Sequence, residues 1–181
     1  MTIAPLGREA TLEDLFAVEG KAELVDGHLV LLPMTSGAHG NAVANIVTSL
    51  KLHQRAYGGG RPFADNVGFV LGPRNSLAPD VSWHVGPWGN KLMDGAPVFA
   101  VEVRSEEDYG PAAERRMAAK RGVYFEAGTQ VVWDVDVMRE NLIRVYRADD
   151  PGHATVYRRG EAAEAEPAVP GWRFPVEELF D

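Results

Sequence analysis

Two hydrophobic periods alternate along the chain. Segment 36–55 predicts a helix, because its apolar residues recur at spacings of three and four. Segment 111–127 predicts a second helix, with proline in its first turn and glycine directly after its last residue. Between them, residues 98–103 form an almost unbroken apolar run, which is typical of a strand buried on both faces. The pattern predicts an α/β fold with a central mixed β-sheet flanked by helices.

Turn residues divide the rest of the chain into short strands. Asp26-Gly27 between two apolar stretches predicts a hairpin over residues 22–32. Strands 66–71 and 79–85 are expected to pair antiparallel. Residues 129–135 predict a strand parallel to 98–103, because a helix connects the two. The remaining expected elements are a short helix capped by Thr11, a loop over 86–97, a hairpin of 141–147 with 154–158, a loose connector over 161–170 and a terminal segment docking through Trp172, Phe174, Leu179 and Phe180.

Length and composition indicate one globular domain over residues 1–181. With 45% hydrophobic and 24% charged residues, the 181-residue chain lies at the globular average. We expect a core over about residues 10–150 and an acidic C-terminal extension over about 160–181. The absence of cysteine excludes disulfides, thiol nucleophiles and thiolate metal sites. No apolar run is long enough for a membrane span, and Met1–Arg8 lacks the features of a signal peptide, so we expect a soluble, cytoplasmic protein.

The net charge of −8 argues against a protein that coats nucleic acid by charge alone. Residues 160–181 contain six acidic residues and one arginine, so residues 1–159 carry a net charge of only −3. A surface that binds nucleic acid is therefore compatible with the main part of the chain.

Three ionisable residues lie where a core pattern would not place them: Asp80 after Pro79, Glu102 inside the apolar strand, and Lys120 on the following helix. A buried carboxylate needs a cationic partner or a bound cation. Two acids from neighbouring strands offer oxygen ligands suited to Mg²⁺ or Mn²⁺. With a lysine nearby to orient the attacking water and stabilise charge, this arrangement suits phosphodiester hydrolysis.

The same residues carry a resemblance to a known superfamily. Pro79-Asp80, a gap of 22 residues, and Glu102-Val103-Arg104 resemble the PD-(D/E)xK nucleases. Within that superfamily the sequence is similar to the Uma-two family of restriction endonucleases over about residues 10–150. The further matching segments are Glu23-Leu24-Val25-Asp26-Gly27, His39, Ser105, Lys120 with Tyr124 and Gly128, Val132-Trp133-Asp134-Val135-Asp136 and Val145-Tyr146-Arg147.

The resemblance implies a restriction-endonuclease-like core and a metal-dependent endonuclease acting on nucleic acid, with DNA as the expected substrate. It implies that Asp80 and Glu102 bind the divalent cation, Mg²⁺ or Mn²⁺, and that Glu23 is a third acid near them. Arg104 stands where the superfamily has lysine; arginine cannot act as a base, so Arg104 is expected to bind phosphate while Lys120 replaces the lysine. His39 and Arg116 are further candidates for substrate contacts.

Each candidate also has a purely structural interpretation. Glu102 could pair with Arg104 or Lys120 for stability alone, and Glu23 could pair with Lys21 or Arg8. Asp80 could cap a turn, Lys120 could be a solvated helix residue, and His39 could be an exposed turn residue.

The corresponding alternative function is a catalytically inactive module that keeps the nuclease fold for binding or interaction. An exposed sheet edge or apolar patch could also support a homodimer.

Overall fold

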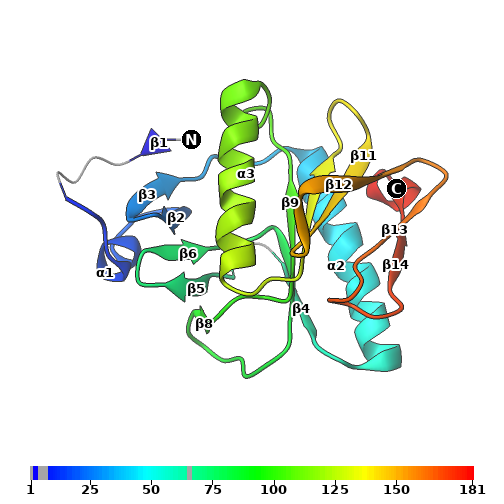
Figure 1. Cartoon of the computed structure of the whole chain (residues 1–181), viewed down its shortest axis with the longest axis horizontal. Helices are drawn as coiled ribbons and strands as arrows, with labels where there is room; N and C mark the ends of the chain where they lie inside the picture. The colour runs from blue at the N-terminus through cyan, green and yellow to red at the C-terminus, as the bar shows by residue number, and fades with distance from the viewer. Residues whose placement is uncertain (1, 4–7, 65–66) are drawn as a thin grey trace.

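The computed structural model describes residues 2–3, 8–64 and 67–181, which form two mixed six-stranded sheets and a small two-stranded sheet (Figure 1). The first sheet has the strand order β1 (Thr2–Ile3), β3 (His28–Leu31), β2 (Ala22–Val25), β6 (Asn75–Leu77), β5 (Phe69–Gly72) and β8 (Met93–Asp94). The central sheet has the order β12 (Asp150–Arg158), β11 (Leu142–Arg147), β10 (Val131–Asp136), β9 (Phe99–Val103), β7 (Val81–His84) and β4 (Arg61–Ala64). The chain passes between these two sheets after β3, β4, β6, β7 and β8.

The helices begin at the residues that the sequence marks for capping. In α1 (Leu12–Phe16), Thr11 and Asp14 form a reciprocal capping box. In α2 (Gly37–Tyr57), the Ser36 hydroxyl accepts a hydrogen bond from the His39 amide. Helix α3 (Pro111–Glu126) starts with proline, and η1 (Val176–Leu179) is a short 3₁₀ helix near the C-terminus.

Side-chain alternation sends neighbouring residues of β9 and β10 to opposite faces of the central sheet. Val101 and Trp133 lie in the large core that α2 and the C-terminal segment cover. Ala100 and Val132 pack with Tyr124 of α3 on the other face. In Figure 1, α3 and α2 accordingly lie on opposite sides of β9, α3 to the left and α2 to the right.

Most predicted elements are present. The 22–32 hairpin is formed by β2 and β3, and Asp26 and Gly27 have φ angles of 48° and 74°, as its tight turn requires. Strand β10 pairs parallel with β9, and α3 connects them, as the sequence predicts. Strands β11 and β12 form the predicted antiparallel hairpin. The predicted α/β fold is confirmed, although the strands divide between two mixed sheets and the small sheet near the C-terminus.

The predicted pairing of strands 66–71 and 79–85 is wrong. Strand β5 turns back at residues 73–74 and pairs with β6, while β7 joins the other sheet between β4 and β9. Residues 78–80, with Pro79 at their centre, connect β6 to β7 where the chain changes sheets. The residue pattern did not indicate β4 (Arg61–Ala64), because Pro62 is unfavourable in a strand. Strand β4 tolerates this proline because it lies at the edge of the sheet. Asn66, the first residue of the predicted strand, lies outside the described residues, as does most of Met1–Arg8.

The predicted loose connector over 161–170 is also wrong. Strand β13 (Ala162–Glu164) pairs with β14 (Arg173–Pro175), and Ala163, Ala165 and Val169 are fully buried in the main core. These side chains are small because they pack against large rings: Trp172 stacks on Trp133 with the ring centroids 5.0 Å apart. Residues 162–180 therefore complete the core.

None of the described helices combines the length and the apolar character that a membrane span requires.

We expect Trp172→Ala to lower the free energy of unfolding by about 3–5 kcal/mol, because a large cavity would remain beside Trp133. Urea denaturation measures this change. Arg173→Ala, at an exposed neighbouring position, serves as the control and should change stability by less than about 0.5 kcal/mol. Equal, small losses for both variants would show that the C-terminal segment is peripheral.

Candidate active site

Glu102 faces α3 because it follows the alternation of β9. Its neighbours Val101 and Val103 lie in the core under α2, so the Glu102 side chain projects from the opposite face. It is not fully enclosed there, since 20% of its side chain is exposed. Strand β9 is therefore the rigid element that carries the Glu102 carboxylate, at the junction of the two sheets.

Lys120 joins the two sheets through a pair of carboxylates. Its Nζ lies 2.8 Å from Oε2 of Glu102 on the central sheet and 3.0 Å from Oε1 of Glu23 on the first sheet. Glu23 is only 1% exposed and also accepts a hydrogen bond of 2.8 Å from the Ala78 amide. Tyr124, one helical turn after Lys120, donates a hydrogen bond of 2.7 Å to Oε1 of Glu102. The sequence resemblance suggested a third acid near the pair, and Glu23 lies there. The ion pair of Glu23 is with Lys120, whereas the structural interpretation paired it with Lys21 or Arg8.

Asp80 lies beside Glu102 at the start of β7. Its Oδ2 accepts a hydrogen bond of 2.7 Å from the Val103 amide, which fixes the carboxylate next to the strand that carries Glu102. Its Oδ1 lies 3.2 Å from Nε2 of His39, near the N-terminus of α2. His39 is only 6% exposed, so its interpretation as an exposed turn residue is wrong.

These side chains line one cavity. A pocket of about 110 Å³ is bounded by His39, Asp80, Glu102 and Lys120, with Asp108 on the loop before α3. Asp80 and Glu102, which the sequence separates by 22 residues, thus meet at a single hollow together with a lysine and a histidine, and Glu23 reaches that lysine from the first sheet.

Burial and neighbouring charges favour a proton on Glu102. Desolvation, with the Asp80 and Glu23 carboxylates nearby, raises the pKa of Glu102 to about 8, although the Lys120 ammonium opposes the shift. One ammonium faces three carboxylates, so the group as a whole has an excess of negative charge when all of them are ionised.

Lys120 is held in its charged form. Burial works against the ammonium, but the Glu102, Glu23 and Asp80 carboxylates outweigh it and raise the pKa of Lys120. Burial and the Glu102 carboxylate raise the pKa of Tyr124. Both side chains are therefore hydrogen-bond donors at neutral pH, and neither acts as a base.

The donor set suits a divalent cation that completes its coordination with water and substrate. Among residues 2–3, 8–64 and 67–181, no three His, Asp or Glu side chains surround a common point at metal-binding distances. Mg²⁺ commonly binds through one or two carboxylates plus phosphate oxygens and water rather than in a cage made by the protein. Asp80 and Glu102 provide hard oxygen donors with unused lone pairs, and a cation would balance the excess negative charge.

Comparison with known proteins identifies the family. A family model described as putative restriction endonuclease matches residues 11–177, which is almost the whole chain. The chain belongs to the Uma2 family. A putative nuclease of DUF820 from Anabaena variabilis ATCC 29413 has a similar solved structure, with a TM-score of 0.76 and 19% identity over 94% of this chain and 97% of that one. No match was found among curated proteins. The Uma2 assignment confirms the resemblance, and the structural similarity confirms the restriction-endonuclease-like fold.

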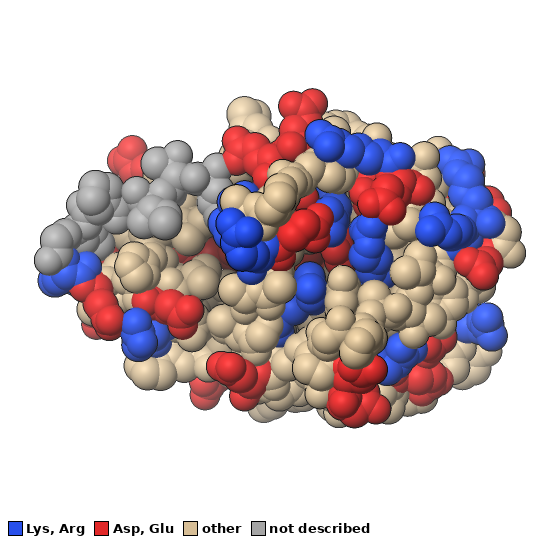
Figure 2. All heavy atoms as spheres, turned by 45° about the horizontal axis from the view of Figure 1, so that its top comes forward, with Lys and Arg blue, Asp and Glu red and all other residues tan. Residues whose placement is uncertain are grey.

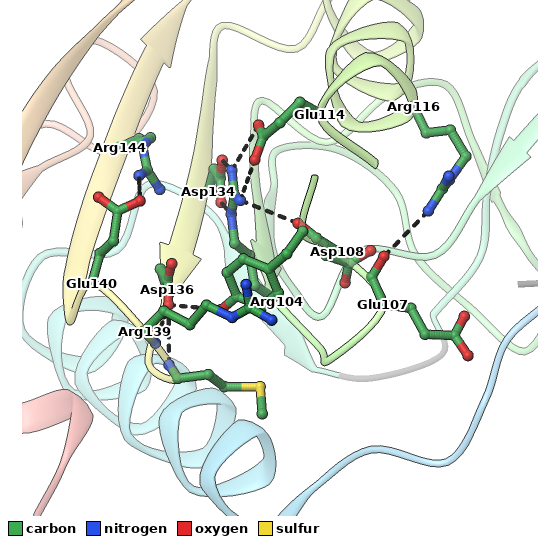
Figure 3. Close-up of polar contacts among 12 residues, drawn as sticks. Arg104, Glu107, Asp108, Glu114, Arg116, Asp134, Asp136, Arg139, Glu140 and Arg144 are labelled. Atoms are coloured by element: carbon green, nitrogen blue, oxygen red, sulfur yellow. Dashed lines mark hydrogen bonds and ion pairs between the residues drawn. The ribbon is translucent and has the colours of Figure 1, made fainter. Parts of the chain in front are cut away.

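Arg104 of this Uma2 chain does not have the position that the sequence suggested. Its guanidinium is 3% exposed and is bonded to Asp134 through Nε at 2.7 Å and Nη2 at 2.6 Å. Nη1 and Nη2 also donate to the Glu114 carboxylate on α3, at 2.5 and 3.0 Å (Figure 3). Two carboxylates occupy its donors, so this geometry does not favour the expected contact with phosphate. Arg104 instead ties β9 to β10 and α3.

Strand register explains why Asp134, the partner of Arg104, faces α3. Asp134 lies opposite Glu102 in the parallel pair of β9 and β10, so both acids face α3. The sequence motif includes Asp134, but the pattern alone did not reveal its pairing with Arg104. Arg116 is exposed and donates to the Glu107 carbonyl at 3.3 Å, so its expected role in substrate binding stays a prediction.

We expect Arg104→Met to lower the free energy of unfolding by about 3–5 kcal/mol, because it leaves the Asp134 carboxylate buried without its cation. Chemical denaturation measures the loss. Arg115→Met removes an equal charge from the exposed side of α3 and should change stability by less than about 0.5 kcal/mol. A fully stable Arg104→Met variant would contradict the structural role.

We also expect the metal-free Uma2 protein to lose stability as the pH rises from about 4.5 to about 8. Over this range Glu102 keeps its proton in the folded protein but loses it in the unfolded chain. The folded state therefore binds more protons, and the free energy of unfolding falls with pH. Denaturation in EDTA at several pH values measures the slope, and Glu102→Gln should remove this contribution. The same slope in wild type and variant would contradict the assignment to Glu102.

Proposed function

We propose that this protein is a metal-dependent endonuclease that hydrolyses phosphodiester bonds in DNA. The observation that carries the proposal is the convergence of Asp80, Glu102 and Lys120 on one pocket at the junction of the two sheets. Membership of the putative restriction endonuclease family supports nuclease chemistry. The metal and the DNA substrate are our inference from the donor set.

Asp80 and Glu102 would hold Mg²⁺ or Mn²⁺ in the proposed reaction. When bound, the cation would neutralise charge on the phosphate and make the attacking water more acidic. Lys120 would donate hydrogen bonds to the water or the phosphate, since the surrounding carboxylates keep it protonated. Glu23 would hold the Lys120 ammonium in position, and His39 would orient the Asp80 carboxylate.

The surface charge suits local contacts with a nucleic acid rather than binding over a broad basic face. Figure 2 shows Lys and Arg side chains interspersed with Asp and Glu over the described part of the face that it presents. A protein of net charge −8 depends on a few well-placed cations and a bound metal to hold a phosphodiester backbone. The expected homodimer and the cytoplasmic location stay predictions.

We expect the wild type to cleave plasmid or oligonucleotide DNA in Mg²⁺ or Mn²⁺. Cleavage should stop when EDTA removes the metal. Asp80→Asn and Glu102→Gln should each lower the cleavage rate by about 100-fold or more, because each removes a metal ligand. Gel assays of nicking and linearisation measure the rates.

Glu126→Gln, at an exposed position on α3, is the matched control and should cleave like the wild type. Calorimetric titration with Mn²⁺ separates binding from catalysis: uptake that disappears in Asp80→Asn would support the metal site. A wild type that takes up metal but cleaves neither DNA nor RNA would favour the catalytically inactive binding module. A wild type that does neither would contradict the proposed metal site as well.

A further inference from the structure

Arg121 lines the same pocket as Asp80 and Glu102 but is not part of their ion-pair cluster. It follows Lys120 on α3, and its Cζ lies 3.8 Å from the ring centroid of Tyr146 on β11. A planar guanidinium stacked on an aromatic ring is held in a defined orientation while its N–H groups remain directed outward in the plane.

Two of the guanidinium nitrogens of Arg121 are buried without an acceptor: among the described residues, Nε and Nη1 have no hydrogen-bond partner. This contrasts with Arg104, which bonds two carboxylates. Nη1 of Arg144, on the strand that carries Tyr146, is also buried without a partner within the described part of the chain. Buried cationic donors without acceptors are costly, so the arrangement favours an anion.

We propose that Arg121 is a substrate-binding residue that holds a backbone phosphate of the nucleic acid, beside the phosphate that is cleaved. The inference rests on the proposed nuclease function and assigns part of its substrate site. Arginine matches the paired oxygens of a phosphate with two parallel N–H groups, and the stacked ring reduces the freedom that binding would otherwise cost.

The position of Arg121 separates it from the reacting phosphate. Lys120 points to Glu102 on β9, whereas Arg121 lies over Tyr146 on β11, two strands further along the central sheet. Neighbouring strands are about 4.8 Å apart, so the two contacts are separated by roughly 10 Å across the sheet. The bound strand would therefore run from the Asp80 and Glu102 pair towards β11.

The test compares Arg121→Gln with Arg55→Gln. Arg55 is exposed near the C-terminal end of α2, about 24 Å along that helix from His39 in the pocket, so its loss removes the same charge elsewhere. Binding of a labelled DNA duplex is measured in Ca²⁺ at several salt concentrations, and cleavage is measured in Mg²⁺.

We expect Arg121→Gln to weaken DNA binding by roughly 10- to 100-fold. The slope of log affinity against log salt should become shallower by about 0.9, the value for one lost phosphate contact. In cleavage, KM should rise more than kcat falls. Arg55→Gln should show none of these changes.

Two more variants keep the test decisive if Arg121→Gln does not fold. Arg121→Lys retains the charge but lacks the paired donors, and Tyr146→Leu removes only the stacking ring; each should raise KM by a smaller factor than Arg121→Gln. If wild type cleaves DNA while all Arg121 and Tyr146 variants behave like Arg55→Gln, the inference is wrong and the proposed function stands. A wild type that neither binds nor cleaves nucleic acid would overturn both.

Discussion

The contact of the Lys120 ammonium with two carboxylates from different sheets is the interaction on which the site depends. Glu102 comes from β9, Glu23 from β2, and Lys120 from α3, so this group fixes three elements relative to one another. Removing one partner from such a buried group leaves an uncompensated charge. The same group contains more carboxylates than ammonium ions, because Asp80 lies close by. A single cluster therefore provides both a structural connection and a local excess of negative charge that a divalent cation can balance.

A second ionic group supports the first from the other end of α3. Arg104 bonds Asp134 on β10 and Glu114 in the first turns of α3, while Lys120 bonds Glu102 further along the helix. Both groups lie on the face of the sheet that α3 covers, and the opposite face is an apolar core under α2. This division lets β9 carry ionisable residues without disturbing the main core. Arg104 thus connects the helix that carries Lys120 to the central sheet without touching the acid pair.

The sequence could predict those features that depend on neighbouring residues. The hairpin at Asp26-Gly27 forms because both residues accept positive φ angles, and α2 begins at Ser36 because its hydroxyl caps the helix. The candidate acids were identifiable because Glu102 interrupts an apolar strand. The partners of β6 and of β7, which lie in different sheets, were not predictable, since a strand of three or four residues carries little information about its partner. The role of residues 162–180 was obscured because alanines pack well only against the large rings that the fold places beside them.

The sequence by itself determined most of the local elements, the α/β class and the identity of the acids and the lysine that line the pocket. The tertiary structure decided which cation each acid meets. Arg104 is two residues from Glu102 in sequence, yet it bonds Asp134, and Lys120 bonds Glu102 instead. Strand register and the path of α3 decide this choice, because an ion pair needs contact within about 4 Å and sequence distance does not measure it. For the same reason only the folded chain shows that Arg121 retains buried donors without an acceptor among the described residues.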